Sequence, residues 1–198
     1  MNGKELIKEG LMTDPKSAKG RLLIEAARLF RVKGYERTTV RDLAAAVGIQ
    51  SGSIFHHFKT KEEILKAVME EVIIYNTHLM RTKLAAASSA KEEVLALITC
   101  EIEAITGVTG DAMSVLVYEW RSLNEGNQRD ILKLRDEYEQ LWLGALDKAK
   151  AEGQIKADTF ILRRFLTGAL SWTTTWYKRD GEISIEDLAE QALLLAIK

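Results

Sequence analysis

The chain has 198 residues, of which 46% are hydrophobic and 29% are charged, and these proportions are ordinary for a globular protein. Its single cysteine excludes a disulfide framework and fits a reducing compartment such as the cytoplasm. No apolar run approaches the ~20 residues of a transmembrane helix. Residues 1–10 also lack the apolar segment of a secretory signal, so we expect no contact with a membrane. A single proline and the lack of alternating β-branched runs predict an all-α fold.

The formal net charge of −1 hides an asymmetry between the two ends of the chain. Residues 1–61 hold 12 basic and 6 acidic side chains, a net charge of +6, and residues 62–198 therefore carry −7. A basic first part on an acidic remainder indicates that only the first part meets a polyanion such as nucleic acid. The alternative is a chance fluctuation of surface charge. We therefore predict a DNA-binding domain over 1–61 and a second domain over 62–198.

Helix-capping signals predict nine helices. The first begins at Asp14 or at Ser17 and ends at Lys33, before Gly34. The other eight are predicted, in chain order, over residues 39–48, 50–57, 61–84, 89–106, 111–124, 127–152, 158–178 and from 184 to the end. No linker or internal repeat interrupts this pattern, so the predicted domain boundary lies inside a continuous helical body.

The second and third predicted helices have the pattern of a helix-turn-helix. Two helices that cross closely need a small residue at the crossing, here Ala44, and a glycine where the backbone turns, here Gly48. Apolar side chains must wedge the pair against the first helix, and the sequence offers Leu43, Val47, Ile49 and Ile54. A helical hairpin inside an ordinary bundle is the alternative, but it does not require all of these features together.

The residues around this turn suit contact with a DNA duplex. The third predicted helix offers short or planar polar groups to base edges and phosphates, and Phe55 offers a ring to a sugar or a thymine methyl. Thr39 begins a helix, where its hydroxyl and N–H suit a phosphate, and Arg41 and Lys61 flank the site as cations. The predicted DNA contacts are Thr39, Arg41, Gln50, Ser51, Gly52, Ser53, Phe55, His56 and Lys61. A solvated polar helix face is the alternative.

Residues 34–62, which read GYERTTVRDLAAAVGIQSGSIFHHFKTKE, resemble the N-terminal domain of the TetR family of transcriptional regulators. The resemblance covers about residues 17–66. It implies a three-helix DNA-binding domain followed by a six-helix domain for ligand binding and dimerisation, and it implies that the predicted contacts above touch DNA. One position departs from the family pattern. Phe55 stands where the family most often has tyrosine, so the phosphate hydrogen bond of that hydroxyl is lost.

The second domain holds all four tryptophans and has the pattern of a binding site for a large apolar ligand with an anionic head. Trp172 and Trp176 are one helical turn apart with hydroxyls between them, and guanidinium groups upstream suit phosphates. The predicted ligand contacts are Tyr118, Trp120, Arg121, Trp142, Arg163, Arg164, Trp172 and Trp176. The alternative is that these aromatic side chains belong to the core.

The segments at 118–121 and 168–181 are similar to TetR members that sense acyl-CoA or other CoA thioesters. This likeness implies a repressor that a thioester releases from a palindromic operator. A homodimer is expected because one short recognition helix reads too few bases. The apolar faces of the last two helices are the candidates for its interface: Phe160, Ile161, Phe165, Leu166, Leu170, Leu188, Ala192, Leu195 and Ala196. The alternative is that these faces close the subunit's own core.

Two other functions stay open at this point. One is a multidrug regulator that senses lipophilic cations through buried carboxylates, for which Glu101, Glu103 and Glu119 are candidates. The other is an all-helical enzyme or lipid carrier. No nucleophile elbow, phosphate loop or metal-binding motif is present, so we expect no enzyme and no cofactor. No histidine and cysteine pair has the spacing of metal ligands, so we expect no metal, and Cys100 among apolar neighbours is expected to be buried.

Overall fold

The computed structural model describes residues 3–197, and every regular element in that range is helical, which confirms the all-α prediction. The elements are α1 (Gly3–Lys8), α2 (Ala18–Lys33), α3 (Val40–Val47), α4 (Ser51–Ile54), α5 (Lys61–Ala86), α6 (Ala90–Thr106), α7 (Gly110–Tyr118), η1 (Trp120–Ser122), α8 (Glu125–Ala151), α9 (Thr159–Trp172), η2 (Thr173–Thr175) and α10 (Ile185–Ala196). Helices α2 to α10 correspond to the nine predicted helices. The short helix α1 was not predicted.

Side-chain caps explain most of the helix starts. Ser17 Oγ accepts from the Gly20 N–H at 3.0 Å, which fixes the start of α2. Asp158 caps α9 through the Ile161 N–H at 3.0 Å. Helix α8 begins earlier than predicted because the side chain of Asn124, rather than Asn127, supplies the cap.

The chain folds into two compact units, and each is described by itself. Unit 1 holds the chain up to Tyr75 and residues 109–135, so it contains α1 to α4, the start of α5, α7, η1 and the start of α8. Unit 2 holds residues 76–108 and the chain from Asp136 on, and it contains the end of α5, α6, the rest of α8, α9, η2 and α10. The predicted boundary at 61/62 falls at the start of α5. The division into a DNA-binding domain before it and a ligand-binding domain after it stays a prediction.

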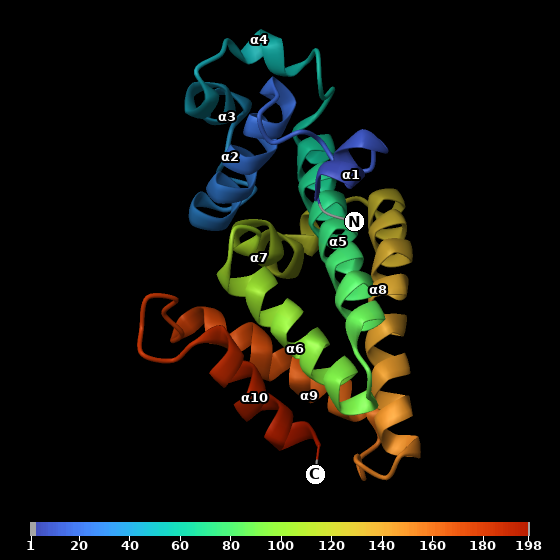
Figure 1. Ribbon diagram of the computed structural model, residues 1–198. Helices are drawn as coiled ribbons and strands as arrows, with labels where there is room; N and C mark the ends of the chain where they lie inside the picture. Colours follow the sequence, from blue (N-terminus) through green and yellow to red (C-terminus); the bar gives the residue numbers. More distant parts are fainter. Residues whose placement is uncertain (1–2, 198) are drawn as a thin grey trace. The chain divides into compact units, whose positions relative to one another are not determined.

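In unit 1, helix α2 packs against both α3 and α7, and α3 packs against α4 (Figure 1). The core of this unit includes the fully buried side chains of Leu22, Phe30, Leu43, Ile54 and Ile64. Ion pairs at the surface join elements that are distant in sequence. Arg31 on α2 meets Asp111 on α7 at 2.6 Å, and Lys66 on α5 meets Asp130 on α8 at 2.7 Å. Such exposed pairs add little stability, so the apolar core holds the unit together.

In unit 2, helix α6 is the central element, because α9 and α10 both pack against it (Figure 1). Trp142 is the largest fully buried side chain of the unit. The loop between η2 and α10 projects away from these helices (Figure 1). Among residues 3–197, no helix is both long enough and apolar enough to cross a membrane.

Candidate nucleic-acid interface

The turn between α3 and α4 has the geometry that the sequence predicts. Gly48 is left-handed, with φ of 71° and ψ of 32°, a conformation that glycine adopts without steric cost. The next N–H, of Ile49, reaches back to the Ala44 carbonyl at 3.0 Å and closes the end of α3. Ala44 is buried at the crossing, and Leu43 and Ile54 are buried with it. This packing holds α4 in one orientation on α3.

The polar surface formed by α4 and the residues directly beside it is open. Gln50, Gly52, Phe55 and His56 are exposed, while Ser51 and Ser53 are half-buried. Phe55 is 55% exposed, so its ring can be reached by a partner. No side-chain hydrogen bond links these residues to another described residue, so their side chains are available to a partner. Their contact with DNA stays a prediction.

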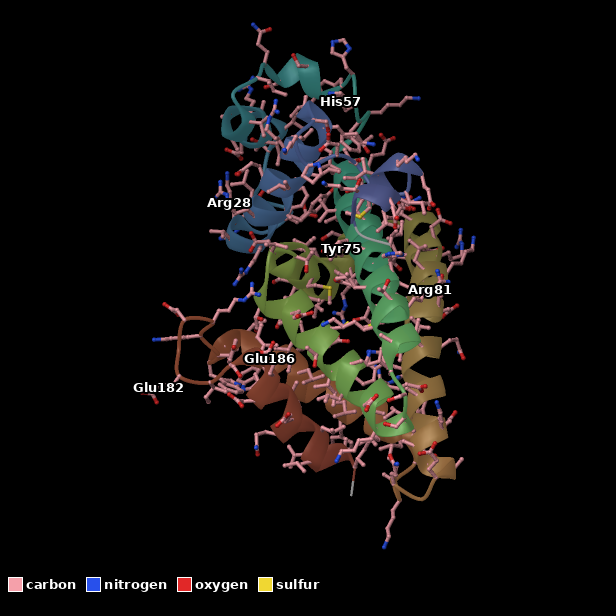
Figure 2. The ribbon with its side chains drawn as sticks, viewed as in Figure 1. Arg28, His57, Tyr75, Arg81, Glu182 and Glu186 are labelled. Carbon is pink, nitrogen blue, oxygen red and sulfur yellow. The ribbon has the colours of Figure 1, made fainter. Side chains whose placement is uncertain are left out.

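Helix α4 is shorter than predicted, since it covers Ser51–Ile54 rather than 50–57. The following residues form tighter turns, in which the His56 and His57 N–H groups donate to carbonyls three residues back. This turn brings Phe58 into the core and redirects the chain into α5. The turn also exposes His57 and Lys59, which the sequence argument missed, and Figure 2 shows His57 beyond the end of α4. In the sequence, the imidazole of His57 and the ammonium group of Lys59 stand close to predicted contacts, and this position is the signal that could have identified them.

Thr39 is already engaged within the subunit. Its hydroxyl donates to Asp42 Oδ2 at 2.8 Å, its N–H donates to the same oxygen at 2.8 Å, and the Asp42 N–H donates back to the hydroxyl. Lys33 Nζ also lies 2.5 Å from this carboxylate oxygen. The hydrogen bond from Lys33 and those from Thr39 lower the pKa of Asp42 from 3.8 to about 2. A phosphate contact from Thr39 therefore has to compete with this capping box.

The two predicted flanking cations are placed differently. Arg41 is exposed, but the ammonium group of Lys61 is turned into unit 1. Lys61 Nζ donates to the carbonyls of Tyr35 at 2.8 Å and Thr38 at 3.0 Å, and it lies 4.0 Å from the centre of the Tyr35 ring. Burial raises the pKa of that Tyr35 phenol to about 12. Lys61 thus fastens the segment before α3 to the start of α5.

Five of the predicted ligand contacts lie in unit 2, on α8, on α9 and just after it, and two of these are buried. Trp142 and Arg163 are packed together, and the Glu101 carboxylate accepts from Trp142 Nε1 at 3.2 Å. The Arg163 Nε donates to Glu139 at 3.2 Å, and Arg164 pairs with the same carboxylate. The structure therefore brings Trp142, Arg163 and Arg164 into one cluster.

Helix α9 ends at Trp172 instead of continuing to 178. The hydroxyls of Thr173, Thr174 and Thr175 each donate to a carbonyl three residues back and tighten the chain into η2. Trp172 and Trp176 are consequently not one α-helical turn apart, although both rings are largely exposed. Neither ring is a core residue of unit 2.

The remaining three predicted ligand contacts belong to unit 1. Tyr118 and Arg121 are exposed, and Trp120 is half-buried with the Arg135 guanidinium 6.0 Å from its ring. Cys100 is buried as predicted, and this burial raises the pKa of its thiol to about 12. Within the described part of the chain, no three histidine, cysteine or acidic side chains gather as a metal site.

Comparison with known proteins places both halves of the chain in one family. Residues 22–68 match the bacterial regulatory proteins of the TetR family, and residues 87–198 match the tetracyclin repressor-like C-terminal domain. The transcriptional repressor KstR2 of Mycolicibacterium smegmatis is 30% identical over 190 residues, which cover 93% of this chain and 91% of that protein.

Solved structures share the fold of this chain. The structure of the superantigen Pfit is 59% identical, covers 99% of this chain and 97% of its own, and has a TM-score of 0.86. AibR in complex with isovaleryl coenzyme A and operator DNA is 22% identical, covers 91% of this chain and 98% of its own, and shares the fold with a TM-score of 0.81. The chain therefore belongs to the TetR family of bacterial transcriptional regulators.

Proposed function

We propose that this regulator is a homodimeric repressor that binds a palindromic operator through α4 and leaves it when a CoA thioester binds. The observation that carries the proposal is the open polar surface of residues 50–56, which include α4, next to the buried side chains of Ala44 and Ile54 and with Gly48 at the turn. Full-length similarity to KstR2, a transcriptional repressor, supports the same role.

The proposed operator contacts begin with the exposed residues that flank α4. Gln50 and His56 offer hydrogen-bonding groups to base edges, and Phe55 offers an apolar ring to a thymine methyl. The other proposed contacts are Thr39, Arg41, Ser51, Gly52, Ser53 and Lys61, of which Thr39 and Lys61 must first give up bonds within the subunit. His57 and Lys59 are added to this set because the turn after α4 exposes them.

A band-shift assay with the DNA upstream of the regulator's own gene tests operator binding. Gln50→Ala combined with Ser53→Ala removes two polar groups from α4, and we expect the retarded band to disappear while the circular dichroism spectrum is unchanged. The matched control is Gln140→Ala, which changes an exposed glutamine on α8. If the double variant binds the fragment as tightly as the wild type, α4 is not the reading element. No retardation of any palindromic fragment by the wild type would favour the enzyme or lipid carrier.

The proposed dimer forms through α9 and α10, whose outer faces expose large apolar side chains: Phe160, Ile161, Phe165, Trp172, Leu194 and Leu195. Phe165 is 74% exposed and Leu195 is 86% exposed. Two predicted interface residues, Leu166 and Leu170, are instead buried inside their own unit, in which α9 packs against α6. A two-fold pair of such subunits presents two α4 helices to half-sites ~34–36 Å apart.

Sedimentation analysis tests the dimer. Phe165→Glu combined with Leu195→Glu places charges on the exposed apolar face, and we expect a molecule of half the wild-type mass. Val108→Glu is the matched control, because Val108 is an exposed apolar residue in the loop between α6 and α7. A wild-type protein that sediments as a monomer at micromolar concentration would contradict the dimer.

Unit 2 supports an anionic, largely apolar effector better than a lipophilic cation. The exposed rings of Trp172 and Trp176 lie on the chain ahead of Lys178 and Arg179, and this combination suits an acyl chain with phosphates. The carboxylates available for a cation are already paired. Glu101 lies beside Arg163, and Glu103 meets Lys83 at 3.0 Å. In unit 1, Glu119 accepts from the Tyr35 N–H at 3.0 Å. AibR, a structure with the same fold, holds isovaleryl coenzyme A.

Thermal-shift screening separates the two effector classes. Any ligand that binds only the folded protein raises the unfolding temperature, and at 100 times Kd the gain is about 2.7 kcal/mol. We expect a shift with acyl-CoA compounds and none with cationic dyes such as ethidium. Compounds that bind are then added to the band-shift assay, where they must release the operator. Stabilisation by dyes alone would transfer the proposal to a multidrug regulator.

A second candidate function follows from the 59% identity to the superantigen Pfit, which extends over 99% of this chain. The chain is therefore a candidate for the activity that the name superantigen denotes, the stimulation of T cells. Endotoxin-free protein added to human peripheral blood cells should then expand T cells of particular receptor β-chain classes. Heat-unfolded protein is the control. Expansion of all classes alike, or of none, would reject this second candidate without affecting the first.

A further inference from the structure

Arg163 on α9 is a buried guanidinium that its own unit does not fully satisfy. Its side chain is only 4% exposed, and the ring of Trp142 lies 4.2 Å from the guanidinium carbon. Nε donates to Glu139 at 3.2 Å, and Nη2 is 3.6 Å from Glu101, beyond hydrogen-bond distance. Nη1 has no acceptor among the described residues. A buried N–H group without an acceptor costs free energy, so Nη1 is a donor to which a ligand can supply the missing acceptor.

The Glu101 carboxylate cannot turn to serve that donor without losing other bonds. The Tyr138 hydroxyl donates to Glu101 Oε2 at 2.7 Å, and Trp142 Nε1 donates to the same oxygen at 3.2 Å. Glu139 is shared between Arg163 and Arg164 in the same way. Both bonds to Glu101 end on Oε2, both oxygens of Glu139 face a guanidinium group, and neither carboxylate reaches Nη1. We therefore look for the acceptor of Nη1 outside the unit's own side chains.

The charges of the cluster decide the chemistry of that acceptor. Two guanidinium groups, of Arg163 and Arg164, stand against two carboxylates, of Glu101 and Glu139. A phosphate or carboxylate brought to Nη1 would add an unbalanced anion to a buried site, and burying such a charge is costly. A neutral carbonyl oxygen accepts the hydrogen bond without changing the balance of charge.

We propose that Arg163 Nη1 donates a hydrogen bond to a neutral carbonyl oxygen of the effector. This inference rests on the proposed function, and in a CoA thioester the acceptor is the thioester carbonyl, while the nucleotide phosphates lie outside the cluster. Arg163 thus takes a different role from the phosphate contact that the sequence pattern predicts. Because Nη1 is enclosed by protein atoms, the neighbouring side chains must move for the acyl group to reach it.

Calorimetric titration of the full-length protein tests this hydrogen bond. The probes are isovaleryl-, octanoyl- and palmitoyl-CoA, each compared with the S-alkyl-CoA thioether of the same chain length, which lacks only the carbonyl oxygen. We expect the wild type to bind its preferred thioester about tenfold or more tightly than the matching thioether, since a site built to hydrogen-bond a group rejects an analogue without it.

Arg163→Lys keeps the positive charge beside Glu139 but removes Nη1, and we expect it to bind thioester and thioether with equal affinity. Arg129→Lys, at an exposed position on α8, is the matched control and keeps the wild-type ratio. If Arg163→Lys does not fold, the ratio in the wild type decides alone. Equal affinities in the wild type overturn the role of Arg163 and leave the proposed function standing. A wild type that binds neither thioester, thioether nor free CoA overturns both.

Discussion

Lys61 and Asp42 are charged residues that stabilise the helix-turn-helix through hydrogen bonds within the subunit. Lys61 is the first residue of α5, where a cation opposes the helix dipole, but two carbonyl groups and the Tyr35 ring offset that penalty. Asp42 receives hydrogen bonds from Thr39 and Lys33 at the start of α3. Both residues therefore act on stability, whatever they do on DNA.

Lys61→Met is expected to destabilise the protein by about 1–3 kcal/mol, because hydrogen bonds from a charged group are lost and the carbonyls of Tyr35 and Thr38 lose their donor. Urea unfolding followed by circular dichroism measures the change. Lys59→Met is the control, since Lys59 is exposed, and it should change stability by no more than about 0.5 kcal/mol. If the Lys61→Met protein is as stable as the wild type, the structural role of Lys61 is wrong and its role as a DNA contact is favoured.

The lowered pKa of Asp42 predicts that the free energy of unfolding decreases in acid. Its pKa is about 2 in the folded protein, against an ordinary value of 3.8. The folded state therefore holds fewer protons than the unfolded state between these values, and stability falls as the pH drops through this window. Asp42→Asn should be less stable than the wild type above pH 4, and the difference should shrink towards pH 2. Urea midpoints at pH 6, 4 and 3 measure it, and a constant difference would contradict the assignment.

At the scale of an element, the turn after α3 is where backbone conformation matters most. Gly48 has φ of +71°, whereas Gly52 has no such constraint, and a Cβ added to either residue meets no atom within 4 Å. Gly48→Ala should therefore cost about 1–2 kcal/mol from backbone strain alone. Gly52→Ala should cost nothing or stabilise slightly, by up to about 1 kcal/mol. Urea unfolding of both variants checks the pair, and equal costs would show that the turn is not strained by a side chain.

Helix starts were predictable from the sequence because caps are local. Ser17 and Asp158 bond N–H groups three residues ahead, within the reach of a sequence pattern. The end of α9 was not predictable in this way. It depends on whether three threonine hydroxyls or the backbone N–H groups donate to the preceding carbonyl groups. Periodicity also could not separate Trp142, which is buried, from Trp172, which is 65% exposed.

Contacts over longer stretches of sequence were beyond prediction for a related reason. Lys61 binds a carbonyl 26 residues away, and Arg163 meets Glu101 on another helix, so neither partner follows from spacing. The helix-turn-helix was recognisable because its small residue, its glycine and its apolar wedge lie within 20 residues. The proposed effector contacts were less predictable because Trp142 comes from α8, whereas Arg163 and Arg164 come from α9.

At the scale of the whole molecule, the division of charge predicts how operator binding responds to salt. Residues 1–61 carry a net charge of +6, and the rest of the chain carries −7, so attraction to DNA is confined to the first part. A dimer that makes 6–10 phosphate contacts should lose about 10³–10⁵ in affinity between 50 and 200 mM salt. Fluorescence anisotropy with labelled operator measures this slope.

The Arg41→Gln variant sharpens the salt experiment. Arg41 is an exposed cation on α3, and its loss should reduce the slope of log affinity against log salt by about 2 in a dimer, one unit for each subunit. Lys156→Gln, in the exposed loop before α9, should leave the slope unchanged. A slope near zero in the wild type would mean that binding does not depend on phosphate contacts.

The membership of residues 109–135 in unit 1 bears on how chimaeric regulators are built. A graft that transfers only the first 61 residues to a new effector half would separate α2 from α7, and Tyr35 from Glu119. A chimaera that also receives α7 and the beginning of α8 from the same donor keeps those partners together. Exchange of operator-binding domains should therefore transfer residues 1–75 together with residues 109–135, which places junctions inside α5, inside α8 and in the loop between α6 and α7.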